Sequence, residues 1–177
     1  EEIMNKLLLV FFICCFSLLS FSQERLKIGD EAPDFLLPYA TKDTIVFSGI
    51  KLSDAVMHGN TILAFYPADW SSGCTKEVCS FRDNFMKLSD INTQILAISG
   101  DYVFSHKEWA KYHNLPFKLL SDHDHSVAKK YFSYDEEKGY NKRTVFVIGK
   151  NLKILYIDYD YKVNDEKDFN DLLNSLK

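Results

Sequence analysis

Two cysteines, Cys74 and Cys79, stand five positions apart in the segment YPADWSSGCTKEVCS, residues 66–80. The other two cysteines of the chain, Cys14 and Cys15, lie within the first twenty residues. A thiolate is a nucleophile, and two thiols that can reach each other can form and release a disulfide. One close pair is unlike the several widely spaced pairs of a disulfide-stapled domain. The pair therefore indicates reactive thiol chemistry.

The position of Cys74 favours the ionised form of its thiol. The apolar run TILAFY, residues 61–66, predicts a buried strand, and a loop over residues 67–73 follows it. Apolar residues at 78, 81, 85 and 88 then predict a helix over residues 74–89. Free backbone N–H groups and the helix dipole at such a start lower the pKa of a thiol. Taken alone, Cys74 could also be a small buried residue without a chemical role.

The rest of the chain supplies elements that could position this loop. Strands are predicted at residues 44–47, 94–99, 117–120, 143–148 and 153–159, and helices at 105–114, from about 121 to 132, and at 165–176. Residues 27–38 are predicted to be an extended lead-in, and residues 51–54 a turn. Strands that alternate with helices, closed by a hairpin and a last helix, predict an α/β fold with a mixed central sheet and helices on both faces.

Composition fits one soluble globular domain. The chain has 177 residues, of which 46% are hydrophobic and 26% charged, and its 14 Phe and 10 Tyr can fill a core. A formal net charge of -4 argues against a nucleic-acid-binding surface, which needs a concentrated basic face.

The first 22 residues have the pattern of a signal peptide. A short basic start is followed by an apolar run over residues 7–21 and by Ser20-Phe21-Ser22, a small-x-small ending. We expect cleavage after Ser22, export, and a periplasmic location, with residues 23–177 as the single mature domain. The alternative is a membrane anchor through residues 7–21, although this run is short for a span.

Several motifs together resemble the peroxiredoxins of the alkyl hydroperoxide reductase/thiol-specific antioxidant superfamily. Pro67, Ser71 and Cys74 match the pattern Pro-x-x-x-Thr/Ser-x-x-Cys. GCTKEVCSFRD, residues 73–83, is most similar to the bacterioferritin comigratory protein, or Q-type, subgroup. GDEAPDFLLP, LPFKLLSDHDHSVAKKY and RTVFVI match further family segments in the expected order. The resemblance implies a thioredoxin-like fold and reduction of hydrogen peroxide and organic hydroperoxides.

The resemblance also implies roles for single residues. Cys74 would be the peroxidatic cysteine, Ser71 the active-site hydroxyl, and Pro67 a shield of the thiolate against water. Arg143 would stabilise both the thiolate and the peroxide, as a permanent cation with several donors can. Two positions depart from the family: Ser71 replaces the commoner Thr, and Ser72 stands where the subgroup usually has Pro. These departures put rate and peroxide preference in doubt more than the type of reaction.

Cys79 is either an inert helix residue or the resolving cysteine. Residues five apart on an ideal helix have Cα atoms separated by roughly 8–9 Å, whereas a disulfide needs less than about 7 Å. A resolving role therefore requires the start of the helix to unwind. Cys74 would become a sulfenic acid, Cys79 would condense with it to a disulfide, and a thioredoxin-like protein would reduce that disulfide.

Other readings remain open. The same fold could serve as an exported thiol–disulfide oxidoreductase, although the mature chain lacks Cys-x-x-Cys, or as a redox-sensing domain. The alternating Asp122-His123-Asp124-His125 does not converge on one helix face, so no metal is predicted, and the chemistry needs no organic cofactor. Glu77 would oppose a nearby thiolate, so we expect it to point elsewhere or to pair with Arg82. The subgroup resemblance suggests a monomer.

Overall fold

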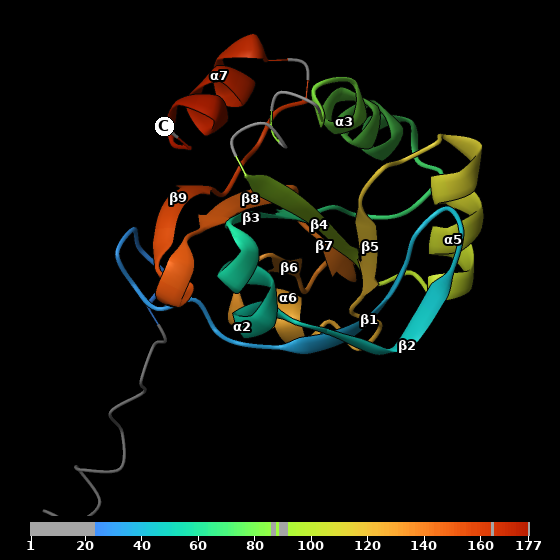
Figure 1. Cartoon of the computed structure of the whole chain (residues 1–177), viewed down its shortest axis with the longest axis horizontal. Coiled ribbons are helices and arrows are strands. Elements are labelled where there is room, and N and C mark those ends of the chain that lie inside the picture. Colours follow the sequence, from blue (N-terminus) through green and yellow to red (C-terminus); the bar gives the residue numbers. More distant parts are fainter. Residues whose placement is uncertain (1–23, 86–87, 89–91, 164, 177) are drawn as a thin grey trace, which may run out of the picture.

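The computed structural model describes residues 24–85, 88, 92–163 and 165–176, and Figure 1 draws the remainder as a thin grey trace. The predicted signal peptide, residues 1–22, lies outside these described residues. Within the described ranges, no helix is both long enough and apolar enough to cross a membrane.

A seven-stranded mixed sheet lies at the centre, with the strand order β2-β1-β5-β4-β3-β8-β9. Along the chain these strands are β1 (Leu36–Ala40), β2 (Ile45–Lys51), β3 (Asn60–Phe65), β4 (Thr93–Ser99), β5 (Lys118–Ser121), β8 (Thr144–Ile148) and β9 (Ile154–Asp158). Strands β3, β4 and β5 run parallel, and the other pairs are antiparallel. The predicted mixed sheet is thus confirmed.

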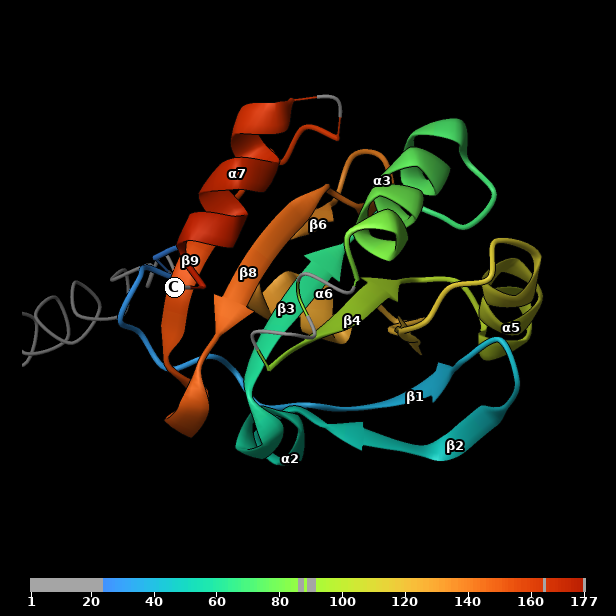
Figure 2. The same cartoon turned by 45° about the horizontal axis from the view of Figure 1, so that its top comes forward.

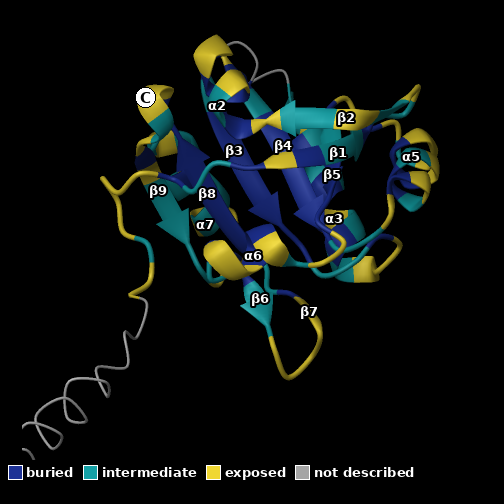
Figure 3. Ribbon diagram, turned by 90° about the horizontal axis from the view of Figure 1, so that it is seen from below, coloured by how far each residue is buried: buried dark blue, intermediate teal, exposed yellow. Residues whose placement is uncertain are grey.

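Helices cover both faces of the sheet, as predicted (Figures 1 and 2). One face carries α3 (Ser72–Asp83), α5 (Val103–Tyr112) and α7 (Glu166–Asn174), and the other carries α2 (Leu52–Ala55) and α6 (Ser126–Lys130). Strand β3 serves both cores because alternate side chains point to opposite faces. Ile62 and Ala64 join the first cluster, and Leu63 and Phe65 the second. Figure 3 shows these central strands buried, which explains their continuous apolar sequence.

The edge of the sheet departs from the sequence predictions. Residues 51–54 were predicted as a turn, but Lys51 ends β2 and residues 52–55 form α2. The end of the predicted lead-in joins the sheet as β1, with a register shift around Pro38, which cannot donate to a ladder. The remaining short elements are η1 (Val56–His58), η2 (Lys150–Leu152) and the hairpin of β6 (Tyr134–Asp135) and β7 (Tyr140–Asn141).

The register of β3 and β8 brings two distant parts of the chain together. These strands are antiparallel, and Phe65 at the end of β3 pairs with Thr144 at the start of β8. Arg143 precedes Thr144, and the loop that leads to α3 follows Phe65. The two segments therefore meet at one edge, beside the carboxyl end of a parallel strand, where α/β sheets commonly bind ligands.

Candidate active site

The thiol of Cys74 lies in the first turn of α3. Ser71 is the N-cap of this helix, and its Oγ accepts a hydrogen bond from the backbone N–H of Cys74 at 3.3 Å. The side chain of Cys74 is fully buried. Helix starts carry partial positive charge from free N–H groups, so this location stabilises a thiolate. The structure thus brings Ser71 and Cys74 together, through a cap that fixes the backbone beneath the sulfur.

Arg143 reaches the same thiol from the start of β8. Its Nη2 donates to Cys74 Sγ at 3.6 Å, although the two residues are 69 positions apart. Its backbone carbonyl accepts from the N–H of Tyr161 at 3.2 Å, which holds the segment in place. The side chain fits closely against α3, since a Cβ added to Gly73 would lie 3.1 Å from Nη2. A guanidinium in this position stabilises negative charge on the sulfur.

Glu77 shares this guanidinium with the thiol. Its Oε2 accepts from Arg143 Nη1, so of the two arrangements expected for Glu77, the pairing with Arg82 is wrong. Arg82 instead binds Asp83 and the backbone carbonyl of His113. Position 77 lies almost one turn beyond Cys74, which places its carboxyl toward the sheet and β8 rather than toward the outer face.

Burial and neighbouring charges together shift the pKa values of Glu77 and Arg143. Burial raises the pKa of Glu77 to about 7, although the cation of Arg143 acts in the opposite direction. Burial alone would lower the pKa of Arg143, but Glu77 and Cys74 outweigh it and raise that pKa. Near neutral pH, the cation of Arg143 therefore contacts a carboxyl that can be neutral or anionic, as well as the sulfur of Cys74.

Replacing Glu77 by glutamine should make folding stability less dependent on pH. A carboxyl whose pKa rises from 4.5 to about 7 on folding stabilises the fold fully below 4.5 and loses that contribution as the pH passes 7. The difference corresponds to roughly 3 kcal/mol. The free energy of unfolding is measured with urea from pH 5 to 8, in proteins that all carry Cys74→Ser. Glu77→Gln should become increasingly more stable than the protein with Glu77 as the pH rises. The matched Glu108→Gln, at an exposed position on α5, should show no such advantage. The same dependence of unfolding free energy on pH in all three proteins would contradict the raised pKa of Glu77.

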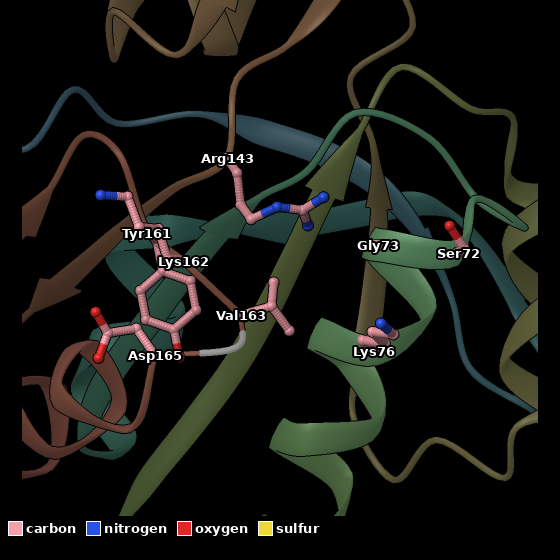
Figure 4. Close-up of a pocket in the computed structure, with 8 residues that line it drawn as sticks. All are labelled: Ser72, Gly73, Lys76, Arg143, Tyr161, Lys162, Val163 and Asp165. Atoms are coloured by element: carbon pink, nitrogen blue, oxygen red, sulfur yellow. The ribbon is translucent and has the colours of Figure 1, made fainter.

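A cavity of about 570 Å³ opens next to Arg143. Its lining includes Ser72, Gly73 and Lys76 from α3, and Tyr161, Val163 and Asp165 from the segment before α7. Figure 4 shows the guanidinium of Arg143 between these two walls, directed toward the first turn of α3. A small polar molecule in this cavity would meet the donors of Arg143 before it met the buried sulfur.

The loop between β3 and α3 is held by a buried polar network that was not predicted from the sequence. Asp69 accepts hydrogen bonds from Tyr66 Oη at 2.8 Å and Ser105 Oγ at 2.7 Å, and its other partner is His106 Nδ1 at 2.9 Å. The backbone N–H of Asp69 donates to Asp101 Oδ2 at 2.8 Å. The local signal in the sequence for this network was an acidic residue in a loop after a buried strand.

The other ring nitrogen of His106 completes the network. His106 Nε2 lies 3.2 Å from the carbonyl oxygen of Leu120 on β5. Both ring nitrogens therefore contact oxygen atoms, which holds the ring between the loop and β5. Pro67 is half-buried in the same loop, two residues before this anchor. The loop is thus fastened to α5 and to the segment after β4, and through His106 to β5.

Cys79 occupies a different environment from Cys74. Both thiols are free, but Cys79 is only half-buried, on the side of α3 that faces the end of α5. Its Sγ lies 3.8 Å from His113 Nδ1. The helix is continuous from Ser72 to Asp83, so the two cysteines stand on an intact helix as the sequence predicted.

Among the described residues, no three His, Cys, Asp or Glu side chains gather in a way that could hold a metal ion. The carboxylate of Asp122 instead accepts from the backbone N–H groups of Val127 and Ala128, at 3.1 and 2.7 Å. Asp122 therefore stabilises the start of α6.

Comparison with known proteins gives consistent matches. Residues 28–157 match the AhpC/TSA family. A protein named putative peroxiredoxin Q, chloroplastic, from Oryza sativa subsp. indica is 35% identical over 154 residues, which cover 86% of this chain and 68% of the rice protein. Peroxiredoxin Bcp of Bacillus subtilis is 31% identical, over 79% of this chain and 89% of its own length. The crystal structure of peroxidoxin BcpB from Mycobacterium tuberculosis has a TM-score of 0.75 and 29% identity, and covers 86% of this chain and 97% of that one.

Proposed function

Because this chain belongs to the AhpC/TSA family, as a peroxiredoxin of the Q or Bcp type with the thioredoxin-like fold, we propose that Cys74 is the nucleophile of its peroxidase reaction. The observation that carries the proposal is the donation from Arg143 Nη2 to Cys74 Sγ, at the start of a helix. Two independent sources of positive charge then stabilise one thiolate.

The first step follows from this arrangement. The Cys74 thiolate attacks one oxygen of a hydroperoxide, the O–O bond breaks, and Cys74 becomes a sulfenic acid. The other oxygen leaves as hydroxide or alkoxide and takes a proton to become water or an alcohol. Arg143 faces both the sulfur and the cavity, so its donors stabilise the charge that develops on the leaving oxygen.

Ser71 and Pro67 have supporting parts in this proposal. The Oγ of Ser71 accepts from the backbone N–H of Cys74, and the same hydroxyl could donate its hydrogen to a peroxide oxygen at the helix start. Pro67 lacks an N–H and is half-buried, so it adds an apolar wall to the loop without a donor that would hold water. The cavity beside Arg143 is the proposed approach for the substrate.

The second step uses Cys79. Its thiolate attacks the sulfenic sulfur, a disulfide with Cys74 forms, and hydroxide leaves as water. Since an intact helix keeps the two sulfurs apart, the first turn of α3 must unwind before this step. A thioredoxin-like dithiol protein would then reduce the disulfide by exchange.

Intact mass after one equivalent of hydrogen peroxide, without reductant, tests both steps on residues 23–177. The wild type should lose two hydrogens as the disulfide forms, whereas Cys79→Ser should gain one or more oxygens. Ser80→Ala, a matched change on the neighbouring position, should behave like the wild type. Gain of oxygen by the wild type would contradict the resolving role of Cys79. An unchanged mass in all three proteins would contradict the peroxidase step and favour a redox-sensing domain.

We also propose export, on the pattern of the first 22 residues alone. The plant relatives whose names give a location are chloroplastic. Cleavage after Ser22 would leave Gln23 as the first residue of the mature protein, which peptide mapping of the protein from its native host would detect. A monomer remains the expected state.

A further inference from the structure

The thiol of Cys79 contacts a histidine from a different helix. Cys79 Sγ lies 3.8 Å from Nδ1 of His113, the residue that caps the end of α5. Arg82, one turn beyond Cys79 on α3, donates from Nη1 to the carbonyl oxygen of His113 at 2.9 Å. The two contacts come from the same face of α3, because residues three apart on a helix are neighbours. The contact between α3 and α5 therefore holds the imidazole against the thiol.

The surroundings of His113 favour its neutral, basic form. Its ring packs against Trp109, Tyr112 and Trp70, with centroid distances of 5.9, 4.9 and 6.4 Å. Partial burial lowers the pKa of His113, and the positive charge of Arg82 lowers it further. Arg82 is itself paired with Asp83, and the other titratable groups at the ring are the Tyr112 phenol and the Cys79 thiol. At neutral pH the imidazole can therefore accept a proton.

We propose that His113 is the general base that takes the proton from Cys79 during disulfide formation. This inference rests on the proposed resolving role of Cys79. His113 removes the thiol proton, the Cys79 thiolate attacks the Cys74 sulfenic sulfur, and the S–O bond breaks as the S–S bond forms. The leaving hydroxide takes up one proton, so the sum is a sulfenic acid and a thiol giving a disulfide and one water. The imidazole ends the step neutral.

The contact can survive the unwinding that the step requires. Cys74 lies in the first turn of α3, whereas Cys79 and Arg82 lie in its second half. If the first turn unwinds, the bond from Arg82 to His113 still holds the second half of α3 against α5. Cys74 then moves toward a Cys79 that stays beside its base.

The size of the effect is bounded by thiol chemistry. A thiol with an ordinary pKa of about 8.5 is roughly 3% ionised at pH 7, so a base can accelerate the step at most about 30-fold there. We expect His113→Gln to slow disulfide formation about tenfold at pH 7. The deficit should shrink toward the alkaline end of the pH range, because thiols there ionise without the help of a base.

The experiment follows the two steps separately over pH 6–9. Protein of residues 23–177 is mixed with hydrogen peroxide, quenched with an alkylating reagent at successive times, and weighed intact. The rate of Cys74 oxidation should be the same in wild type and His113→Gln, and only the conversion of sulfenic acid to disulfide should slow. His58→Gln, which removes an exposed histidine of η1, should match the wild type at every pH. In His113→Ala, added imidazole should restore part of the rate.

Each contrary result has a distinct meaning. Equal rates of disulfide formation in wild type and His113→Gln would overturn the proposal. A slowing that is the same at every pH, without rescue by imidazole, would assign His113 a packing role only and would also overturn it. If the wild type itself forms no disulfide, or does not react with peroxide, then the proposed function has failed rather than the part assigned to His113.

Discussion

The peroxidase activity of a Cys74→Ser variant should be at least about 10⁴-fold lower than that of the wild type. Attack on an O–O bond needs an anionic, polarisable nucleophile, and an alcohol is not ionised at neutral pH. The substitution is nearly isosteric, and the hydroxyl can still accept from Arg143 Nη2 in place of the sulfur. The fold should therefore remain, and the loss would report chemistry. Consumption of hydrogen peroxide with dithiothreitol as reductant measures the activity.

Cys79→Ser provides the control for this variant. It keeps Cys74 and its contact with Arg143, so its first turnover should run at the wild-type rate. If Cys74→Ser retained more than about 1% of the activity while Cys79→Ser lost it, the two cysteines would have the opposite roles.

Arg143→Gln should lower the rate constant for reaction with peroxide about 10²–10³-fold, the usual cost of one donor to a developing oxyanion. It should also make the Cys74 thiolate less stable, because the cation beside the sulfur is gone. Stopped-flow mixing with peroxide at several pH values separates the two effects. The part of the rate loss that comes from a less stable thiolate should diminish at high pH. The part that comes from weaker stabilisation of the leaving oxygen should persist.

Glu77 complicates this variant, and a double variant resolves the complication. Without Arg143, the buried Glu77 carboxyl has no cation, and its pKa, which is about 7 beside Arg143, rises further, so that the carboxyl takes a proton and becomes neutral. We therefore expect a loss of stability of about 1–3 kcal/mol, because the hydrogen bond between Arg143 and Glu77 is lost. Arg143→Gln with Glu77→Gln should recover part of that stability without recovering the rate. Recovery of the rate would show that Arg143 acts only by neutralising Glu77.

The sequence was most informative where one physical requirement decides a position. The apolar strand of residues 61–66 and the helical stripe that follows it predicted the surroundings of Cys74, because apolar runs and helical periodicity are local patterns. The meeting of Arg143 with Cys74 came only from the resemblance. Its geometric cause is the antiparallel register of Phe65 with Thr144, which no local pattern contains.

The errors have a common origin in contacts between distant segments. Pairing with Arg82 was one of the two arrangements expected for Glu77, yet the helix turns the carboxyl toward the sheet and Arg143. Likewise, Asp69 and His106 lie 37 positions apart, and neither residue alone indicates a buried pair. Strand β1 was missed because Pro38 argues locally against a strand, whereas a register irregularity accommodates it.

The anchored loop before α3 limits how far oxidation can disturb the molecule. Asp69 is tied to Asp101, Ser105 and His106, so the chain that can move toward Cys79 begins only after it. Cys74 lies five positions after Asp69, a tether of at most about 17 Å when fully extended. The first turn of α3 can thus open as a local unit of low stability while the sheet and α5 keep their hydrogen-exchange protection. In the proposed redox cycle the movement is then confined to one short hinge, which takes Cys74 out of the first hydrophobic core and leaves the second core unchanged.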